Sequence, residues 1–482
     1  MKQTFFFLLI ILGFSACKSD DLTVDPADPI EPVEEVIIYY INDPHGKIHN
    51  FAKIKDIVQE DRDAGKQVAL VCSGDLFSGD PTVDNYPEKG YPMIDLMNKL
   101  DFDVSVIGNH EFDYGQEVLN DRMDQSEFEW ICANMDTDNA ILNDPKEFIT
   151  LSFGDFDITF LGLVETYGRE GYLIPATHPY KVENIDFYHP QEFYKNYANL
   201  QDEEGSDMLI LLSHLGYRSS NGGTFRDVEL ANDADFIDLI IGGHSHVTKD
   251  TLVNNIPIYQ AGAYLNTLGK ITIHIDSLSE LSYQYETIDL NSYSLEDPEI
   301  VASIQAFEED MSFLNEVVGY AAINHNIYGA GCLYTEALHN RTGVDFVIQN
   351  RGGIRSGIDQ GEINIRDLLL VDPFNNNTIQ VDISVGALKV FLENLNGSFF
   401  FHGLNPVKNE DGSFTLFDQD WNPMSDQQQI TMAINDYLFA VNEDYLPDTY
   451  SLLEKTTSEY LIEYVSSLSN DIEISWCHNY ID

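Results

Sequence analysis

Five short apolar runs, each followed within three residues by Asp, Asn or His, constrain the fold of this 482-residue chain more than any other feature. The runs occupy residues 36–41, 67–72, 104–107, 208–212 and 239–241. Helical patterns follow several of them, as where Phe51, Ile54 and Val58 share one face after the first run. Buried strands that alternate with helices predict a layered α/β domain.

The side chains that follow the runs are of the types that bind transition metals. Seven of them are candidate ligands: Asp43, His45, Asp75, Asn109, His214, His244 and His246. Open α/β sheets bind ligands beyond the carboxyl ends of their strands, so we expect these groups to meet at one edge. Mixed imidazole and carboxylate donors suit Zn, Fe or Mn better than Ca. Seven ligands are too many for one tetrahedral ion and predict two divalent ions with a shared carboxylate.

The motifs D-x-H-G, G-D, G-N-H-E-F-D, S-H and G-G-H-S-H, in this order, resemble those of the calcineurin-type metallophosphoesterases. The resemblance is to the 5′-nucleotidase branch in particular. It implies that residues 36–296 form a catalytic domain of four layers, α/β/β/α.

The resemblance also implies roles for individual residues. The ligands divide between two ions, with Asp75 bridging: Asp43, His45 and His246 on one, and Asn109, His214 and His244 on the other. His110 and Asp113 resemble the catalytic dyad of the family, and Asn109 beside them would help to stabilise charge on the phosphoryl group.

A helix is predicted after the catalytic domain. Asp297 can cap it, Pro298 suits its first turn and Gly319 suits its end. We therefore expect a connector helix over residues 297–319 and a second, smaller α/β domain over residues 320–482.

The second domain contains the residues expected to bind substrate. All four arginines of residues 301–482 lie between positions 341 and 366, and clustered guanidinium groups suit a phosphate. The segments N-R-G-G-I-R, P-F-N-N and T-M-A-I-N-D-Y-L-F-A-V-N-E-D-Y resemble motifs of the 5′-nucleotidase C-terminal domain. By that resemblance Asn350 and Arg355 contact the substrate, and Phe374 and Tyr445 clamp a nucleobase.

Two segments depart from the family pattern. Residues 441–445 read V-N-E-D-Y where the family carries G-G-D-G-Y. Residues 397–429 do not match the corresponding family segment and contain no arginine. The base preference and the strength of the phosphate clamp are therefore left open.

The first residues indicate export. Residues 1–17 read as a signal peptide whose apolar run is too short to span a bilayer, and F-S-A-C resembles a lipobox that would make Cys17 the lipidation site. Residues 18–35 are acidic and read as a tether. We expect an exported bacterial lipoprotein of the outer membrane, facing the periplasm or the cell surface. The other four cysteines show no close-spaced framework, and we expect no essential disulfide.

The net charge of the chain narrows the range of possible partners and substrates. With 25 Lys+Arg against 81 Asp+Glu, the net charge of −56 makes nucleic acid a poor partner, so local cations must bind any small anionic substrate. Together with the predicted metal ligands, the resemblance implies a dinuclear-metal phosphohydrolase that removes phosphate from 5′-nucleotides by attack of a metal-bridging hydroxide. The alternative keeps the same metals with 2′,3′-cyclic nucleotides, UDP-sugars or thiosulfate esters as substrates. The sequence leaves monomer or dimer open. A non-catalytic surface nucleotide-binding lipoprotein is less compatible with a sequence that retains all ligand and dyad positions.

Overall fold

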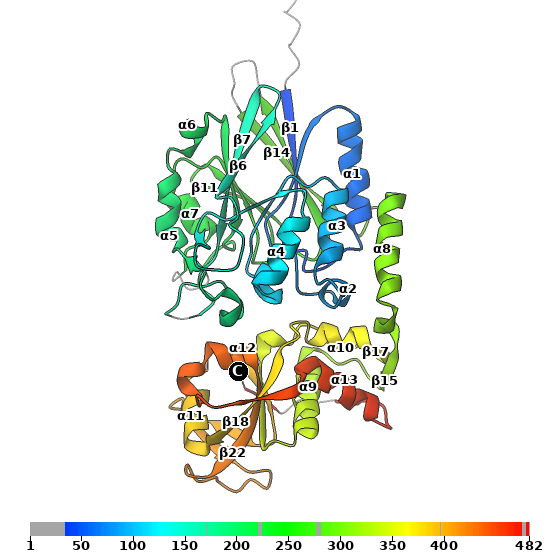
Figure 1. The fold of residues 1–482 in the computed structure, drawn as a ribbon, viewed down its shortest axis with the longest axis vertical. Helices are drawn as coiled ribbons and strands as arrows, with labels where there is room; N and C mark the ends of the chain where they lie inside the picture. Colours follow the sequence, from blue (N-terminus) through cyan, green and yellow to red (C-terminus); the bar gives the residue numbers. More distant parts are fainter. Residues whose placement is uncertain are drawn as a thin grey trace, which may run out of the picture.

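The computed structural model describes residues 34–169, 171–219, 224–275, 281–395, 397–474 and 479–481. The expected signal peptide, Cys17 and nearly all of the tether lie outside these residues. The chain forms two domains, one above the other in Figure 1, and the first strand already begins at Glu34. A search of the described helices finds none with the length and apolar character needed to span a membrane.

The N-terminal domain contains two six-stranded sheets. The first has the order β14-β13-β1-β2-β3-β4, with β1 to β4 parallel. Its strands are β1 (Glu34–Ile41), β2 (Gln67–Cys72), β3 (Val104–Val106), β4 (Glu129–Ile131), β13 (Thr267–Ile275) and β14 (Leu281–Asp289). The second has the order β11-β12-β10-β9-β7-β6. Its strands are β6 (Phe148–Phe153), β7 (Phe156–Val164), β9 (Met208–His214), β10 (Leu239–Gly242), β11 (Thr248–Val253) and β12 (Ile256–Ala261).

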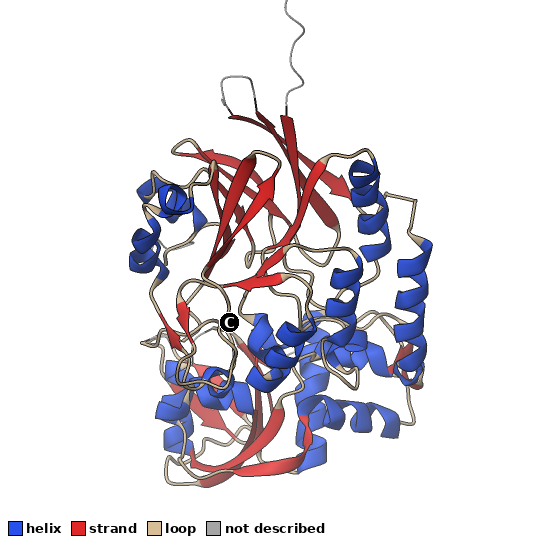
Figure 2. Ribbon diagram, turned by 45° about the horizontal axis from the view of Figure 1, so that its top comes forward, coloured by secondary structure: helices blue, strands red, loops and turns tan. Residues whose placement is uncertain are grey.

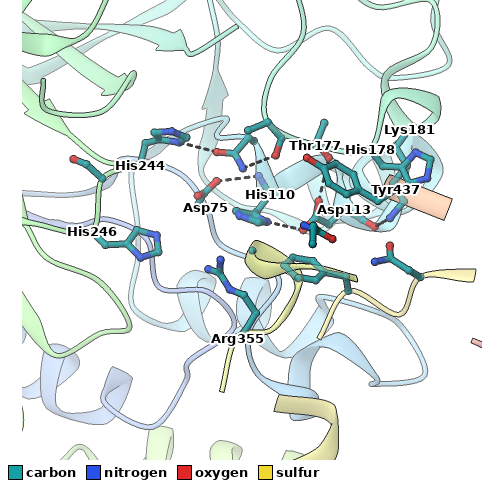
Figure 3. A pocket seen from close by; sticks show the side chains of 18 residues that line it. Asp75, His110, Asp113, Thr177, His178, Lys181, His244, His246, Arg355 and Tyr437 are labelled. Carbon is teal, nitrogen blue, oxygen red and sulfur yellow. Dashed lines mark hydrogen bonds and ion pairs between the residues drawn. The ribbon is translucent and has the colours of Figure 1, made fainter. Parts of the chain in front are cut away.

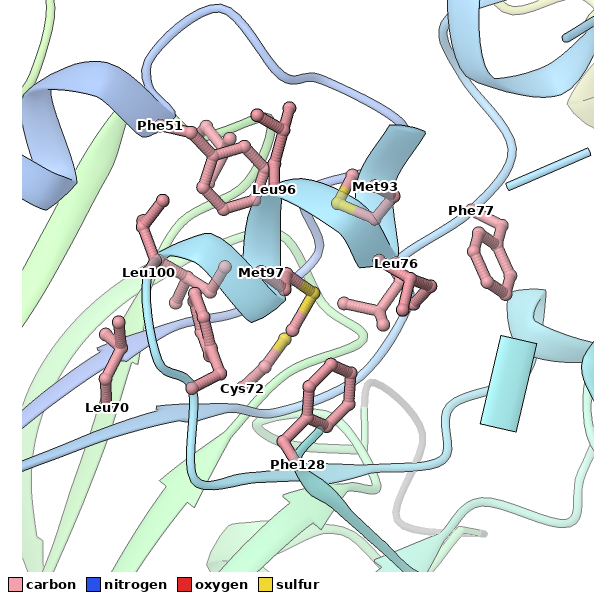
Figure 4. Close-up of a cluster of buried hydrophobic side chains, with 14 of the residues drawn as sticks. Phe51, Leu70, Cys72, Leu76, Phe77, Met93, Leu96, Met97, Leu100 and Phe128 are labelled. Carbon is pink, nitrogen blue, oxygen red and sulfur yellow. The ribbon is translucent and has the colours of Figure 1, made fainter. Parts of the chain in front are cut away.

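Alternating side chains of β1 divide between two cores. Ile37 and Tyr39 face a core shared with helices, part of which is drawn in Figure 4, whereas Val36 and Ile38 face a core between the two sheets. Helices α1 (Phe51–Asp63), α3 (Tyr91–Lys99) and α4 (Gln116–Gln125) cover the first sheet, and α6 (Leu200–Glu204) and α7 (Asp227–Asp233) cover the second (Figure 2). The predicted four-layer α/β/β/α order is therefore confirmed, and all five predicted strands are present.

The connector is shorter than predicted. Asp297 does cap α8 (Pro298–Asp310), its side chain accepting from the backbone of Glu299 and Ile300. The helix ends at Asp310, however, and a short 3-10 turn leads into β15 (Val317–Ala321). Gly319 therefore lies in a strand, because residues 317–321 pair with β17 (Gly361–Asn364), a contact that local sequence does not reveal. The apolar side of α8 packs on the N-terminal domain (Figure 1).

The C-terminal domain is built on one six-stranded sheet of order β23-β18-β22-β16-β19-β24. Its strands are β16 (Phe346–Asn350), β18 (Asn377–Ser384), β19 (Phe399–His402), β22 (Gln429–Asn435), β23 (Ser451–Thr456) and β24 (Tyr480–Ile481). Helices α9 (Ile327–Thr342) and α13 (Thr457–Ser467) cover one face, while α11 (Val385–Asn394) and the hairpin β20 (Asn405–Lys408)–β21 (Phe414–Phe417) cover the other. Helices α10 (Ile365–Val371) and α12 (Asp436–Val441) lie toward the N-terminal domain (Figure 1).

The cysteines that the structure describes differ in their bonding. Cys72 and Cys132 are buried free thiols, as expected for small apolar residues. Cys332, on α9, is disulfide-bonded, although the spacing of the cysteines shows no disulfide framework.

Candidate metal centre and substrate cavity

The metal-binding candidates lie on tight loops beyond the strand ends of both sheets. Five of them have positive φ angles, namely Asp43 (50°), His45 (48°), Asp75 (59°), His244 (70°) and His246 (54°). Left-handed backbone at a residue other than Gly costs about 1–2 kcal/mol and concentrates at functional sites. Gly108 packs against these loops so closely that a Cβ there would lie 2.4 Å from Asp75 Oδ1.

The loops bring the carboxylates and imidazoles into two compact groups. Ligand atoms of Asp43, His45, Asp75 and His246 lie within 4.8 Å of one another, and those of Asp75, His214 and His244 do the same. Asp75 belongs to both groups, as a bridging ligand would. Asn109 lies beside the second group, where its Oδ1 is 2.9 Å from His244 Nδ1. The structure thus brings all seven predicted ligands to one centre.

The orientation of the imidazoles fits a metal site. His45 Nδ1 lies 3.1 Å from the carbonyl of Ser78, and His214 Nδ1 lies 2.6 Å from that of Ser73. A carbonyl only accepts, so each Nδ1 carries the proton and each Nε2 offers its lone pair to the centre. His45 Nε2 and His246 Nε2 lie only 2.8 Å apart, a contact that suits a shared cation. Burial lowers the pKa of both rings, to about 4 for His246, and so favours the neutral form that binds metal.

His110 forms the predicted dyad. Its Nδ1 lies 2.6 Å from Asp113 Oδ2, and its backbone N–H donates to Asp75 Oδ1 at 2.9 Å. Burial acts to lower the pKa of His110, but the Asp113 and Asp75 carboxylates outweigh it and raise the pKa to about 9. The imidazole is thus charged near neutral pH and able to donate a proton.

A cavity of about 430 Å³ lies between the domains and joins the metal groups to the second domain (Figure 3). The residues that line it from the N-terminal domain include Asp75, Asn109, His110, Asp113, Thr177, His178, Lys181, His244 and His246. Those from the C-terminal domain are Asn350, Gly352, Gly353, Arg355, Phe374, Asn376 and Tyr437. The Phe374 ring faces His110 at 6.2 Å between centroids with 20° between planes. Asn350, Arg355 and Phe374, predicted to bind substrate, therefore line the same cavity as the metal groups.

The structure does not place Tyr445 at the cavity, where the sequence led us to expect it. Tyr445 is 41% exposed and is not among the residues that line the cavity, whereas Tyr437 is. Asn435 caps α12 directly after β22, which places Tyr437 in the first turn at the cavity. The turn before Tyr445 is instead held by Arg169, whose Nη1 and Nη2 both lie 3.3 Å from Glu443 Oε1.

Sequence reasoning also missed Thr177, His178 and Lys181. They lie on the loop after β7, where no apolar strand directly precedes them to mark a strand end. Thr177 Oγ1 donates to Asp113 Oδ1 at 3.1 Å, and Lys181 Nζ donates to the Asp113 carbonyl. Glu111 was present in the G-N-H-E motif but received no role. Its buried carboxylate accepts from the backbone of Asp75, Leu76 and Gly108, and so fixes two ligand loops.

Two family models match the chain. Residues 37–248 match the calcineurin-like phosphoesterase model, and residues 322–446 match the 5′-nucleotidase C-terminal domain. The trifunctional nucleotide phosphoesterase YfkN of Bacillus subtilis is 27% identical over 82% of this chain, which spans only 29% of that protein. A 5′-nucleotidase of Vibrio parahaemolyticus is 26% identical, with 78% of this chain and 76% of that protein covered.

The crystal structure of a 5′-nucleotidase precursor from Thermus thermophilus has the same fold. Its TM-score is 0.76 at 19% identity, with 91% of this chain and 97% of that chain covered. The first domain and its ligand loops define a calcineurin-like phosphoesterase. With the second domain matched as well, the chain belongs to the 5′-nucleotidase family.

Proposed function

We propose that this protein is a metal-dependent phosphohydrolase that removes the phosphate of 5′-nucleotides. The observation that carries the proposal is the single cavity that combines the metal groups and the His110–Asp113 dyad with Arg355 and Phe374 of the other domain. The names of the relatives support a nucleotide substrate.

Two divalent ions fit the donor set. Asp43, His45 and His246 would hold one, and His214, His244 and Asn109 the other, with Asp75 shared. When bound, such ions supply a nucleophile from water near neutral pH and positive charge beside the phosphoryl oxygens. Zn, Mn or Fe would each suit these ligands.

The side chains of the chain perform the remaining steps. His110, charged and oriented by Asp113, donates its proton to the ester oxygen of the leaving nucleoside. Arg355 binds the phosphoryl oxygens in the forked geometry of a guanidinium. Asn109 and the protonated His110 stabilise the charge that develops on those oxygens.

The rest of the nucleotide extends along the second domain. Phe374 and Tyr437 offer aromatic surfaces on which a base stacks, and Asn350 and Asn376 offer amide groups. Holding the nucleoside in this way fixes the phosphorus beside the metal groups and lowers the entropic part of the barrier.

A substrate panel tests the proposal. The purified protein, loaded with Mn²⁺ or Zn²⁺, is assayed for phosphate release from AMP, UMP, 2′,3′-cyclic AMP and UDP-glucose. We expect kcat/KM for at least one 5′-nucleotide to exceed that for the other substrates by about tenfold or more. No turnover of any 5′-nucleotide would refute it, and a preference for cyclic nucleotides or UDP-glucose would move the function to that alternative. Nucleotide binding without phosphate release would favour a binding protein.

We also propose that the protein is anchored to the outer membrane through Cys17. The proposal rests on the sequence of residues 1–17 and the acidic residues after them. Labelling of growing cells with a fatty-acid analogue should modify the wild type and not a Cys17→Ala variant. Equal labelling, or none in the wild type, would contradict the anchor.

A further inference from the structure

A concave site on the C-terminal domain takes no part in the proposed reaction. It lies beside the hairpin of β20 and β21 and has a volume of about 270 Å³. The side chains of Trp421 and four neutral polar residues line it: His402, Asn405, Gln419 and Asn479. It falls largely within residues 397–429, which carry none of the motifs quoted for the family, although the match to the 5′-nucleotidase C-terminal domain extends over them.

Trp421 is held in an unusual position. Its side chain is 62% exposed, and its backbone has a φ of 62°, the left-handed region that bulky residues avoid. Phe417 supports the indole at 5.7 Å between ring centroids, so the ring rests on the hairpin while most of it faces solvent. Both the exposed indole and the strained backbone cost free energy, and such costs concentrate where a residue binds something.

The turn that carries Trp421 is fixed by hydrogen bonds. The Asp418 carboxylate accepts from the backbone of Asp420 at 2.9 Å and of Asn422 at 2.8 Å. The backbone N–H of Trp421 donates to the Asp418 carbonyl at 3.0 Å, and Asn405 Nδ2 donates to the same carbonyl at 2.8 Å. The indole is therefore pre-positioned beside Asn405, and a ligand that stacks on it need not order the loop.

The chemistry of the lining selects the ligand. No Lys, Arg, Asp or Glu is among the described residues that line the site, so none of them offers a charged side chain to an ionic ligand. The amides of Asn405 and Gln419 can both donate and accept, and Gln419 has no hydrogen-bond partner among the described residues. A planar indole beside neutral amides suits a ligand with one apolar face and a rim of hydroxyl groups.

We propose that this site binds a pyranose ring of a neutral saccharide, stacked on Trp421 and hydrogen-bonded by the amides around it. The volume lies just below the roughly 300–1,000 Å³ typical of drug-sized pockets, which suits a single ring rather than a long chain. The ring comes either from a free saccharide or from the end of a glycan.

Calorimetry with the full-length wild type and a Trp421→Ala variant tests the site. The probes are methyl glycosides of glucose, galactose, mannose and N-acetylglucosamine, together with immobilised polysaccharides that end in each sugar. We expect at least one probe to bind with a Kd below about 10 mM, and Trp421→Ala to weaken it about tenfold or more. Gln419→Ala should weaken it less. Tyr320→Ala, which removes another exposed aromatic residue on β15, should leave it unchanged.

The outcomes are decisive for the site and separate from the proposed reaction. Binding of glycosides alone would indicate a free saccharide, and binding of polysaccharide ends alone would indicate a glycan. No binding by any probe, or equal binding by Trp421→Ala, would overturn the proposal. Phosphate release from AMP and the thermal midpoint should match the wild type in Trp421→Ala, because the site shares no residue with the cavity between the domains.

Discussion

On the N-terminal side of the cavity, most of the metal-binding candidates are buried and held by hydrogen bonds to the backbone. On the C-terminal side, most of the lining residues are exposed or half-buried. Asp43, His45 and Asp75 are almost fully buried, and backbone groups hold the far nitrogen of His45. Arg355 is exposed, and Phe374 and Tyr437 are half-buried. We therefore expect the buried N-terminal side to determine the chemistry and the more exposed C-terminal side to determine the choice of substrate.

On the N-terminal side, the largest effect is expected for Asp75→Ala, because Asp75 is shared by both ligand groups. We expect loss of bound metal and a fall in kcat/KM of more than about 10³-fold, or about 4 kcal/mol of transition-state stabilisation. Metal analysis and phosphate release measure the two effects. Asp138→Ala, which removes an exposed carboxyl of the same domain, is the matched control. Full metal content in Asp75→Ala would break the assignment.

Removing the dyad should affect turnover but not the metal groups. His110→Ala takes away the proton donor and leaves the ligand side chains in place, so we expect kcat to fall by about 10²–10⁴-fold with metal content unchanged. Asp113→Asn should give a smaller loss, since the imidazole is retained but poorly oriented. If His110→Ala loses its metals, the residue belongs to the metal site instead.

Substitutions on the C-terminal side of the cavity should mainly change KM. Tyr437→Ala and Phe374→Ala each remove an aromatic surface from the cavity, and we expect KM for AMP to rise about tenfold with a smaller change in kcat. Tyr445→Ala is the matched control and should change KM less than about twofold. A large effect of Tyr445→Ala with none from Tyr437→Ala would reverse the correction drawn from the structure.

The smallest effect is expected for the ion pair between Glu443 and Arg169. Glu443→Gln removes the charge that pairs with Arg169 across the two domains, and a partly exposed pair of this kind is worth about 0.2–1 kcal/mol. Stability in urea should change within that range, and the change should shrink in high salt because ions screen the pair. A loss above about 2 kcal/mol would show that the contact matters more to the fold than its exposure suggests.

How much the sequence could predict depends on whether a segment is fixed by nearby residues or by distant ones. The run at residues 67–72 is apolar after Gln67 and its last four residues are buried, as expected for a strand in a sheet core, so the position of Asp75 just beyond its end follows. The end of α8 was wrong because β15 is fixed by pairing with β17, far along the chain. Local sequence also does not reveal that Glu443, in the turn before Tyr445, contacts Arg169, which lies 274 positions earlier. Local sequence patterns therefore predict elements that neighbouring residues determine. They do not predict contacts between residues that are far apart in the sequence.

The left-handed backbone at five ligand positions has a consequence for handling the protein. Bound cations would offset the strain of these loops, and stripping them with a chelator would leave the strain uncompensated at a single edge of the first domain. That edge would then open before the rest of the domain and become the preferred point of attack for a protease. Preparations kept with divalent salts should consequently remain intact for longer than preparations stored in EDTA.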